Sequence, residues 1–164
     1  MTPEQRIYGV VPPEQARTLS GLEWMQGWAE GRLPAPPIGQ VFDFDISQVE
    51  PGRVVFAGAP DARFYNPIGT VHGGYAATLL DSCMGCAVHT TLAPGQWHTT
   101  LEIKINYVRA MNDRTGPVTA EGRVLHAGRQ VATAEGFLRD SQGRLMAHGT
   151  TTCAIFPRAG GSEG

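Results

Sequence analysis

Hydrophobic residues recur along this chain with two different periods. In SGLEWMQGWAEG they return every three or four residues, and Ser20 and Glu23 have the spacing of a capping box. This pattern predicts an amphipathic helix over about residues 20–30 that ends at Gly31. Prolines interrupt residues 1–17 and the segment LPAPPIGQ, so we expect an irregular start before this helix and a proline-rich connector after it.

From Gln40 onwards the period changes to two. In QVFDFDISQVE apolar and polar side chains alternate, and GRVVFAGAP is typical of a second strand that follows a Pro51-Gly52 turn. Strand patterns also fill the last third of the chain, in the segments HTTLEIKINYVRA, GPVTAEGRVLHAG, RQVATAEGFLRDSQ and GRLMAHGTTTCAIF. The turns between these segments are short, and short turns join antiparallel neighbours rather than βαβ crossovers.

Between the two groups of strands lies one long segment, about residues 73–90, whose side chains are almost all small or apolar. We expect a helix that is buried nearly all round, and a curled antiparallel sheet can bury it. The predicted fold is therefore α+β, with one curved sheet wrapped around one central helix. The predicted boundaries are an N-terminal helical extension at 1–39, the sheet-and-helix domain at 40–157 and a flexible tail at 158–164.

Composition narrows the class of protein. The 164 residues suffice for one domain, and 41% are hydrophobic and 17% charged, as in a globular protein. A net charge of −2 does not attract a polyanion, so we expect no nucleic-acid partner. No apolar run approaches the roughly 18 residues of a membrane span, and the N-terminus lacks a signal pattern. With three cysteines the sequence predicts a cytoplasmic protein, in which Cys83 and Cys86 pack as apolar side chains and bind no metal.

The start of the long helix carries the first indication of chemistry. His72, Gly73 and Gly74 stand where backbone N–H groups have no partner inside the helix and where the helix dipole is positive. Glycine lets another group approach such a backbone closely, so this position suits an oxygen that develops negative charge. The alternative is that the two glycines only permit tight packing.

Asp81 is the one acidic residue of this helix. On a helix surface an aspartate needs no explanation, but among small apolar neighbours a carboxylate is costly without a partner or a function. Gly73 and Asp81 are eight residues apart, about 12 Å along a helix, so one substrate carbonyl cannot touch both in the same chain. If they act together, they come from two subunits with antiparallel helices, which predicts an obligate dimer.

The segment from Asn66 to Gly85 has the pattern N-P-x-G-x-x-H-G-G-x-x-x-x-L-x-D-x-x-x-G. It resembles the signature of hotdog-fold acyl-CoA thioesterases, in the branch of the phenylacetate-degradation (PaaI-type) proteins and the 4-hydroxybenzoyl-CoA thioesterases. The resemblance extends over about residues 40–156. It implies hydrolysis of an acyl-CoA to a carboxylic acid and coenzyme A, no metal or organic cofactor, and a homodimer or a homotetramer built as a dimer of dimers.

The resemblance also implies roles for single residues. Gly73 would polarise the thioester carbonyl through its N–H, and Asp81 of the other subunit would be the nucleophile or the general base. Asn66 would orient the nucleophilic water or the thioester, and His72 would set the geometry of the helix start. In each case a simpler role is open: Asn66 suits a turn, and His72 suits local backbone groups.

The remaining candidates are less distinctive. Thr99 matches a Ser or Thr that positions water, with Thr100 as the neighbour it is most easily confused with. Gly74 and Tyr75 are expected to contact substrate, and Phe64 and Tyr65 are further candidates for an acyl pocket. Coenzyme A phosphates favour arginines, of which Arg109, Arg123 and Arg129 lie near turns. The other histidines are interpreted as surface or core residues: His89, His98, His126 and His148.

Two other classes of hotdog protein are compatible with the fold. A non-catalytic acyl-CoA-binding protein would bind the ester without releasing thiol, and the presence of Asp81 argues against it. A hotdog dehydratase or hydratase would carry an Asp and His pair in a different arrangement, which this sequence does not contain.

Overall fold

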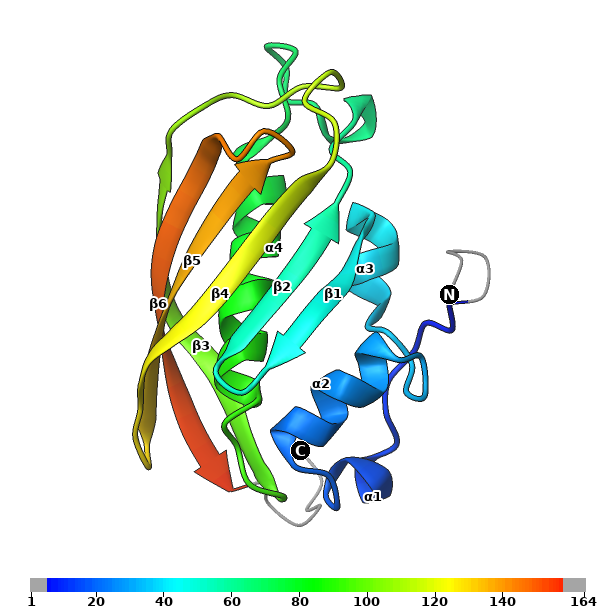
Figure 1. The fold of residues 1–164 in the computed structure, drawn as a ribbon, viewed down its shortest axis with the longest axis vertical. Helices are drawn as coiled ribbons and strands as arrows, with labels where there is room; N and C mark the ends of the chain where they lie inside the picture. The colour runs from blue at the N-terminus through cyan, green and yellow to red at the C-terminus, as the bar shows by residue number, and fades with distance from the viewer. Residues whose placement is uncertain (1–5, 158–164) are drawn as a thin grey trace.

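One curved antiparallel sheet holds a long helix, α4, against its concave face (Figure 1). The computed structural model describes residues 6–157. The helices are α1 (Pro13–Ala16), α2 (Gly21–Ala29), α3 (Pro37–Phe42) and α4 (Gly73–His89), with a 3-10 turn at Ala62–Phe64. The strands are β1 (Phe44–Glu50), β2 (Arg53–Gly58), β3 (Gln96–Tyr107), β4 (Val118–Ala127), β5 (Val131–Asp140) and β6 (Leu145–Pro157). They form a six-stranded sheet in the order β1-β2-β4-β5-β6-β3.

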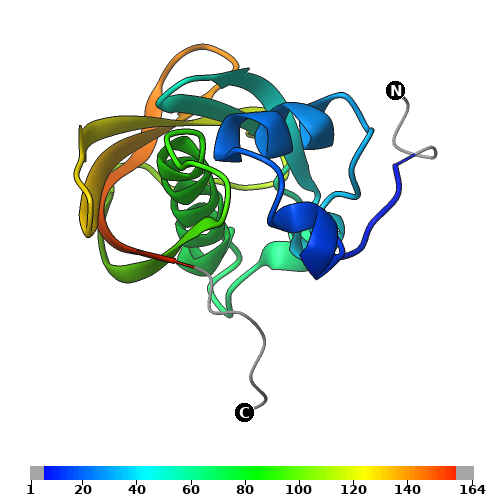
Figure 2. The ribbon, with the colours of Figure 1, turned by 90° about the horizontal axis from the view of Figure 1, so that it is seen from below.

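The core lies between α4 and the sheet. Seen along the helix, the strands curl around α4 (Figure 2). Leu79, Leu80 and Met84 are fully buried on the side of α4 that faces the sheet, and each such side chain stabilises the fold by about 1.5–3 kcal/mol. Glycines in the sheet make room for the helix: a Cβ on Gly122 of β4 would lie 2.2 Å from the Cys83 carbonyl oxygen. The expected α+β arrangement is confirmed.

Both predicted helices are present. Helix α2 begins after Ser20, whose side chain accepts from the Glu23 N–H while the Glu23 carboxylate accepts from the Ser20 N–H, as the capping-box spacing predicts. Helix α4 ends at His89, one residue before the predicted end. The segment expected to be irregular also contains the short helix α1.

The start of the first strand was predicted wrongly. Val41 and Phe42 belong to α3, and β1 begins at Phe44. Pro37 occupies the first turn of α3, where its fixed φ suits a helix and its missing N–H has no cost. Asp43, with φ of 54°, ends the helix in the left-handed conformation and turns the chain into the strand. Proline at a helix start therefore overrode the alternating pattern.

The short turns predicted antiparallel pairing of neighbours among the last four strands, and this prediction is only partly correct. β4, β5 and β6 are antiparallel neighbours, as predicted. β3, however, pairs with β6 and not with β4, and β4 pairs instead with β2. The connection from β3 to β4 crosses the end of the sheet, and β3 becomes an edge strand (Figure 1).

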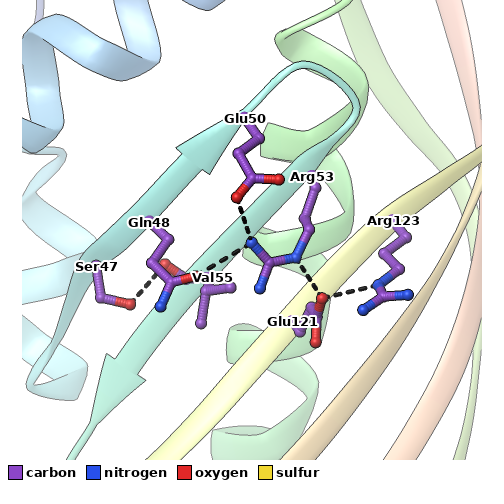
Figure 3. Close-up of polar contacts among 7 residues, drawn as sticks. All are labelled: Ser47, Gln48, Glu50, Arg53, Val55, Glu121 and Arg123. Atoms are coloured by element: carbon purple, nitrogen blue, oxygen red, sulfur yellow. Dashed lines mark hydrogen bonds and ion pairs between the residues drawn. The ribbon is translucent and has the colours of Figure 1, made fainter.

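The convex face of the sheet is polar. On it the Arg53 guanidinium contacts the carboxylates of Glu50 and Glu121, and Arg123 donates to the same Glu121 (Figure 3). Arg123 is thus engaged by a carboxylate on the face away from α4, which makes it a poor candidate for a phosphate at the helix start.

The N-terminal extension packs beside β1 and reaches the C-terminal end of α4 (Figure 2). Trp28 Nε1 donates to Asp45 Oδ1 at 2.9 Å, and the Gly21 N–H donates to the Leu92 carbonyl at 3.0 Å. A Cβ on Gly21 would lie 1.6 Å from the His89 carbonyl oxygen, so glycine is required for this close approach. Within residues 6–157 no helix is long and apolar enough to cross a membrane.

Candidate functional site

Asp81 projects from the side of α4 that the sheet leaves uncovered. Thr100 Oγ1 on β3 donates a hydrogen bond of 2.9 Å to Asp81 Oδ1. Thr99 is exposed and, as the next residue along the strand, points to the other face. Thr100, the neighbour with which Thr99 is most easily confused, is therefore the residue that contacts Asp81, and we add it to the candidate site. The positioning of water by Thr99 stays a prediction.

The expectation that α4 is buried nearly all round holds for most of the helix but not for Asp81. Ten of its 17 residues are buried, whereas Asp81 is exposed. Gly74 and Thr78 lie seven and three residues before Asp81 on the same side and are only partly buried. In the single chain the carboxylate is solvated, so the cost of burial is no argument for a function of Asp81. The arguments for a function are its hydrogen bond to Thr100 and its partly buried neighbours.

The start of α4 leaves one backbone donor free. His72 is the N-cap: its Nδ1 accepts from the Gly74 N–H at 2.8 Å, and its carbonyl accepts from the Tyr75 N–H at 3.0 Å. Across residues 6–157 the Gly73 N–H has no hydrogen-bond partner. Gly73 is thus the one of the two glycines whose N–H is free to donate to a new oxygen ligand, and His72 has the structural role of positioning it.

A cavity of about 370 Å³ opens beside Gly73. Tyr107 and Arg109, at and just beyond the end of β3, lie on its wall. A Cβ on Gly73 would lie 3.1 Å from Tyr107 Cζ, so the ring closes against the bare backbone. Of the three arginines considered for coenzyme A phosphates, Arg109 lines this cavity, while Arg123 is paired on the convex face.

Tyr75 lies on the other side of the helix start. Its side chain is 1% exposed and packs against Phe64, with ring centroids 4.8 Å apart, and against Phe42. Its hydroxyl has no hydrogen-bond partner among residues 6–157, and burial raises its pKa. Tyr75, Gly74 and His72 border a separate cavity of about 380 Å³. The predicted substrate contacts of Gly74 and Tyr75 therefore belong to a different cavity from that of Gly73.

Asn66 closes the loop that leads into α4. Its Oδ1 accepts from the N–H groups of Ile68 and Thr70, and its Nδ2 donates to Thr70 Oγ1 at 2.9 Å. These bonds fit the turn role that the sequence left open, and the orientation of water or thioester by Asn66 stays a prediction.

The two cysteines of the C-x-x-C pattern behave as apolar side chains. Cys83 is fully buried, and its Sγ contacts the Leu80 carbonyl oxygen at 3.3 Å. Cys86 is partly buried, and burial raises the pKa of both thiols. No group of three or more His, Cys, Asp or Glu within residues 6–157 is arranged to hold a metal ion.

Two histidines that the sequence assigned to the surface or the core form a close pair at the end of α4. His89, at the end of α4, and His98, on β3, face each other with their Nδ1 atoms 3.3 Å apart. Burial, with a contribution from His98, lowers the pKa of His89 to about 4, so its imidazole is neutral at pH 7. The sequence offered one signal: His98 and Thr100 are two residues apart on a strand and so share a face.

Comparisons with known proteins agree on one family. The thioesterase superfamily profile matches residues 68–147. The proofreading thioesterase EntH of Cronobacter sakazakii is 33% identical over 96 residues, which cover 58% of this chain and 69% of EntH. Conserved protein PA5202 from Pseudomonas aeruginosa superposes with a TM-score of 0.69 at 32% identity, covering 74% of this chain and 95% of PA5202. The smu.793 protein of Streptococcus mutans, solved bound to acetyl CoA, gives a TM-score of 0.64 at 27% identity, covering 70% and 90% of the two chains.

Proposed function

This chain belongs to the thioesterase superfamily and has the hotdog fold, and on that basis we propose that it hydrolyses an acyl-CoA to a carboxylic acid and free coenzyme A. The observation that carries the proposal is the pair of half-sites on α4. One is the free Gly73 N–H beside a cavity, and the other is Asp81 held by Thr100. The acyl-CoA bound in the structure of smu.793 supports coenzyme A as the carrier.

Two copies of the chain complete the site. Gly73 and Asp81 are eight residues apart on one helix, about 12 Å, which is too far for one carbonyl carbon. β3 offers the surface for pairing: it is an edge strand, and its Leu101 side chain is 62% exposed. An unpaired strand edge readily accepts a second strand.

The register of this pairing follows from the contacts of β3. Thr100 is hydrogen-bonded to Asp81, and the Tyr107 ring lies against Gly73. Leu101 is the extra residue of a β-bulge, so Lys104 is the middle of the paired segment from Thr100 to Tyr107. Antiparallel pairing of two β3 strands about a two-fold axis at Lys104 puts Thr100 of one copy opposite Tyr107 of the other. Asp81 of the partner subunit then approaches Gly73, and each homodimer has two equivalent sites. A tetramer would double this unit.

The proposed reaction uses groups of the chain and water. The Gly73 N–H donates to the carbonyl oxygen of the thioester and stabilises the oxyanion. Asp81 of the partner subunit removes a proton from water, whose oxygen bonds to the carbonyl carbon. The C–S bond then breaks, and the proton passes to the thiolate of coenzyme A. In the nucleophilic alternative the carboxylate bonds to the carbonyl carbon and the C–S bond breaks, which releases the thiolate of coenzyme A. Water then hydrolyses the resulting anhydride, which regenerates Asp81 and supplies the proton for the thiolate.

Other residues have supporting roles in the proposal. Thr100 orients the carboxylate, His72 fixes the helix start, and Arg109 attracts a phosphate of coenzyme A at the cavity beside Gly73. Asn66 holds the loop before His72.

The test is thiol release from phenylacetyl-, 4-hydroxybenzoyl-, butyryl- and octanoyl-CoA by wild type, Asp81→Asn and Ser82→Ala. Asparagine keeps the size of the side chain but can neither take the proton nor attack, so we expect kcat to fall by about 10²–10⁴-fold. Ser82→Ala changes the neighbouring position and is expected to stay within about twofold. Full turnover by Asp81→Asn contradicts the mechanism, and stoichiometric binding without thiol release from any ester contradicts hydrolysis.

A further inference from the structure

One side of α4 carries three residues spaced by one turn of the helix: Asp81, Gly85 and His89. Two side chains of β3 pack over this line. Thr100 is hydrogen-bonded to Asp81. His98, two residues earlier on the same face of the strand, lies over Gly85 and meets His89. His98 therefore lies between the carboxylate of the candidate site and the C-terminal end of the helix.

The missing side chain of Gly85 makes room for the His98 ring. The atom nearest to a Cβ on Gly85 would be His98 Nε2, at 3.2 Å. Side chains on a helix lean toward its N-terminus, so a side chain at this position would cover the turn that carries Asp81. His98 Nε2 lies in that space instead. Asp81 and Gly85 are about 6 Å apart along the helix, so Nε2 is close enough to meet a group bound at the carboxylate directly or through one water.

The two ring nitrogens of His98 have different surroundings. The side chain is partly buried, and its Nε2 has no hydrogen-bond partner among residues 6–157. Its Nδ1 lies 3.3 Å from Nδ1 of His89. Burial, with a contribution from His98, lowers the pKa of His89 to about 4, so His89 is neutral at pH 7 and can present a lone pair at Nδ1. When His98 donates its Nδ1 proton to this lone pair, its own Nε2 is left as a proton acceptor.

The surroundings of His98 make it neutral at rest. It lies on the wall of a cavity of about 310 Å³ between the N-terminal extension and α4, which all three tryptophans of the sequence line: Trp24, Trp28 and Trp97. No Asp, Glu, Lys or Arg lines this cavity within residues 6–157. Burial lowers the pKa of His98, and the negative charge of Asp81 opposes this effect because it favours the imidazolium. His98 is thus neutral at pH 7, and its cation is stabilised by the carboxylate beside it.

The proposed pairing of two β3 strands places the leaving group on the side of His98. With Thr100 opposite Tyr107 of the partner subunit, the register continued by two residues puts His98 opposite Arg109 of the partner subunit. Directly opposite residues lie on the same face of the sheet. Because Arg109 of the partner subunit attracts coenzyme A in the proposed function, we expect the sulfur to leave on the side of the carboxylate where His98 lies.

We propose that His98 is a catalytic residue that carries a proton from Asp81 of the same chain to the leaving sulfur, and that His89 positions it by accepting from its Nδ1. The assignment rests on the proposed function in its general-base form. Asp81 takes a proton from water while the water oxygen bonds to the carbonyl carbon, and it passes this proton to His98 Nε2. The C–S bond then breaks, its electron pair stays on sulfur, and the imidazolium protonates the thiolate. Coenzyme A leaves as the thiol, and His98 is neutral again.

The acidity of the leaving thiol tests this role. S-(4-nitrophenyl) thiobutyrate releases a thiol far more acidic than that of coenzyme A, and its thiolate leaves without a proton. In His98→Gln we therefore expect kcat for butyryl-CoA to fall by about 10²-fold or more and kcat for the aryl ester to stay within about threefold. His126→Gln makes the same change at an exposed histidine of β4 and is expected to leave both values unchanged. Equal losses on both esters, or no loss on butyryl-CoA, overturn the assignment.

The positioning role of His89 has its own test. His89→Phe keeps a ring but cannot accept from His98, so we expect kcat for butyryl-CoA to fall about tenfold. His89→Gln has an amide oxygen that can accept, and it is expected to recover most of this loss. Turnover of the aryl ester should change in neither variant. Similar losses in both variants, or on both esters, would show that His89 only packs in the core.

Two further variants apply if His98→Gln does not fold or if wild type does not cleave the aryl ester. Gly85→Ala suits a helix better than glycine, and its Cβ displaces His98 Nε2, so it is expected to lower kcat for butyryl-CoA as well. His98→Ala leaves space for free imidazole, which is expected to restore thiol release from butyryl-CoA with saturation. Full turnover by Gly85→Ala together with no rescue by imidazole overturns the assignment, and circular dichroism shows whether each variant is folded.

Asp81→Asn separates the failure of this proposal from the failure of the proposed function. It is expected to lose turnover of both esters, because both need a proton to be removed from water. Loss of both esters in Asp81→Asn with full activity in His98→Gln overturns the proton transfer by His98 and keeps hydrolysis. Wild type that releases no thiol from either ester overturns both proposals.

Discussion

Thr100 Oγ1 lies 2.9 Å from Asp81 Oδ1, and this hydrogen bond ties the edge strand β3 to the central helix. It forms beside a β-bulge, because the register between β3 and β6 shifts between Thr100 and Glu102 and leaves Leu101 without a partner on β6. Bulges commonly re-aim side chains next to active sites. At this bulge the Thr100 side chain points to α4 and contacts Asp81, while the adjacent Leu101 side chain is exposed.

The hydroxyl of Thr100 is predicted to matter for turnover. Thr100→Val removes the hydroxyl with little change of shape, so the Asp81 carboxylate loses its donor, and we expect kcat to fall about tenfold. Thr99→Val makes the same chemical change on the opposite face and is expected to stay within about twofold. Thiol release by both variants checks this. A larger loss of turnover in Thr99→Val would show that the hydroxyl of Thr99, and not that of Thr100, supports the reaction.

The free edge of β3 is predicted to be the subunit interface. Leu101→Lys places a charge on that strand and is expected to shift the mass seen by light scattering to one chain, with turnover falling in parallel. Leu125→Lys introduces the same charge at an equally exposed leucine of β4, where Leu125 is 58% exposed, and should change neither mass nor turnover. Leu101→Lys that keeps the wild-type mass and activity would contradict pairing through β3.

Gly21 is predicted to fasten the extension to α4. In Gly21→Ala the new Cβ meets the His89 carbonyl, a backbone group that cannot move aside alone, so we expect a loss of about 3 kcal/mol in the free energy of unfolding. Gly9→Ala is the control, since its Cβ would make an ordinary contact of 3.7 Å with Pro34. Urea unfolding of both variants measures the difference, and equal stabilities would rule out the close approach.

Stability is predicted to fall between about pH 6.5 and about pH 4 because of His89. The pKa of His89 is lowered to about 4 in the folded chain by burial, so the unfolded chain takes up a proton at a higher pH than the folded chain does. Lowering the pH through this window therefore favours unfolding, by up to roughly 3 kcal/mol, and the stability is fully present above it. No further loss from this group is expected below about pH 4.

The measurement is the free energy of unfolding of wild type and His89→Gln at about pH 7 and about pH 5, because glutamine keeps a polar group but does not titrate there. The drop between the two pH values should be smaller in the variant, whatever its absolute stability. An equal drop in both proteins would assign the pH dependence to other groups.

Local patterns in the sequence were sufficient for the elements whose signals are local. The capping box of Ser20 and Glu23, the apolar run of α4 and the strand segments of β4 to β6 depend on neighbours within a few residues, and each forms as predicted. Where two local signals competed, the wrong one was chosen: the alternation around Val41 suggested a strand, but Pro37 started a helix there.

The tertiary structure decided what depends on residues far apart in the chain. Strand pairing that places β3 beside β6 put Thr100, and not Thr99, on Asp81, since a shift of one residue along a strand reverses the face of a side chain. Packing of α2 against the end of α4 brought Trp97 to Trp24 and Trp28, although Trp97 is far from both in the chain. The sequence thus predicted a candidate site at His72-Gly73-Gly74 and Asp81 from residue types and spacing, whereas the cavity lined by the three tryptophans exists only where distant segments meet.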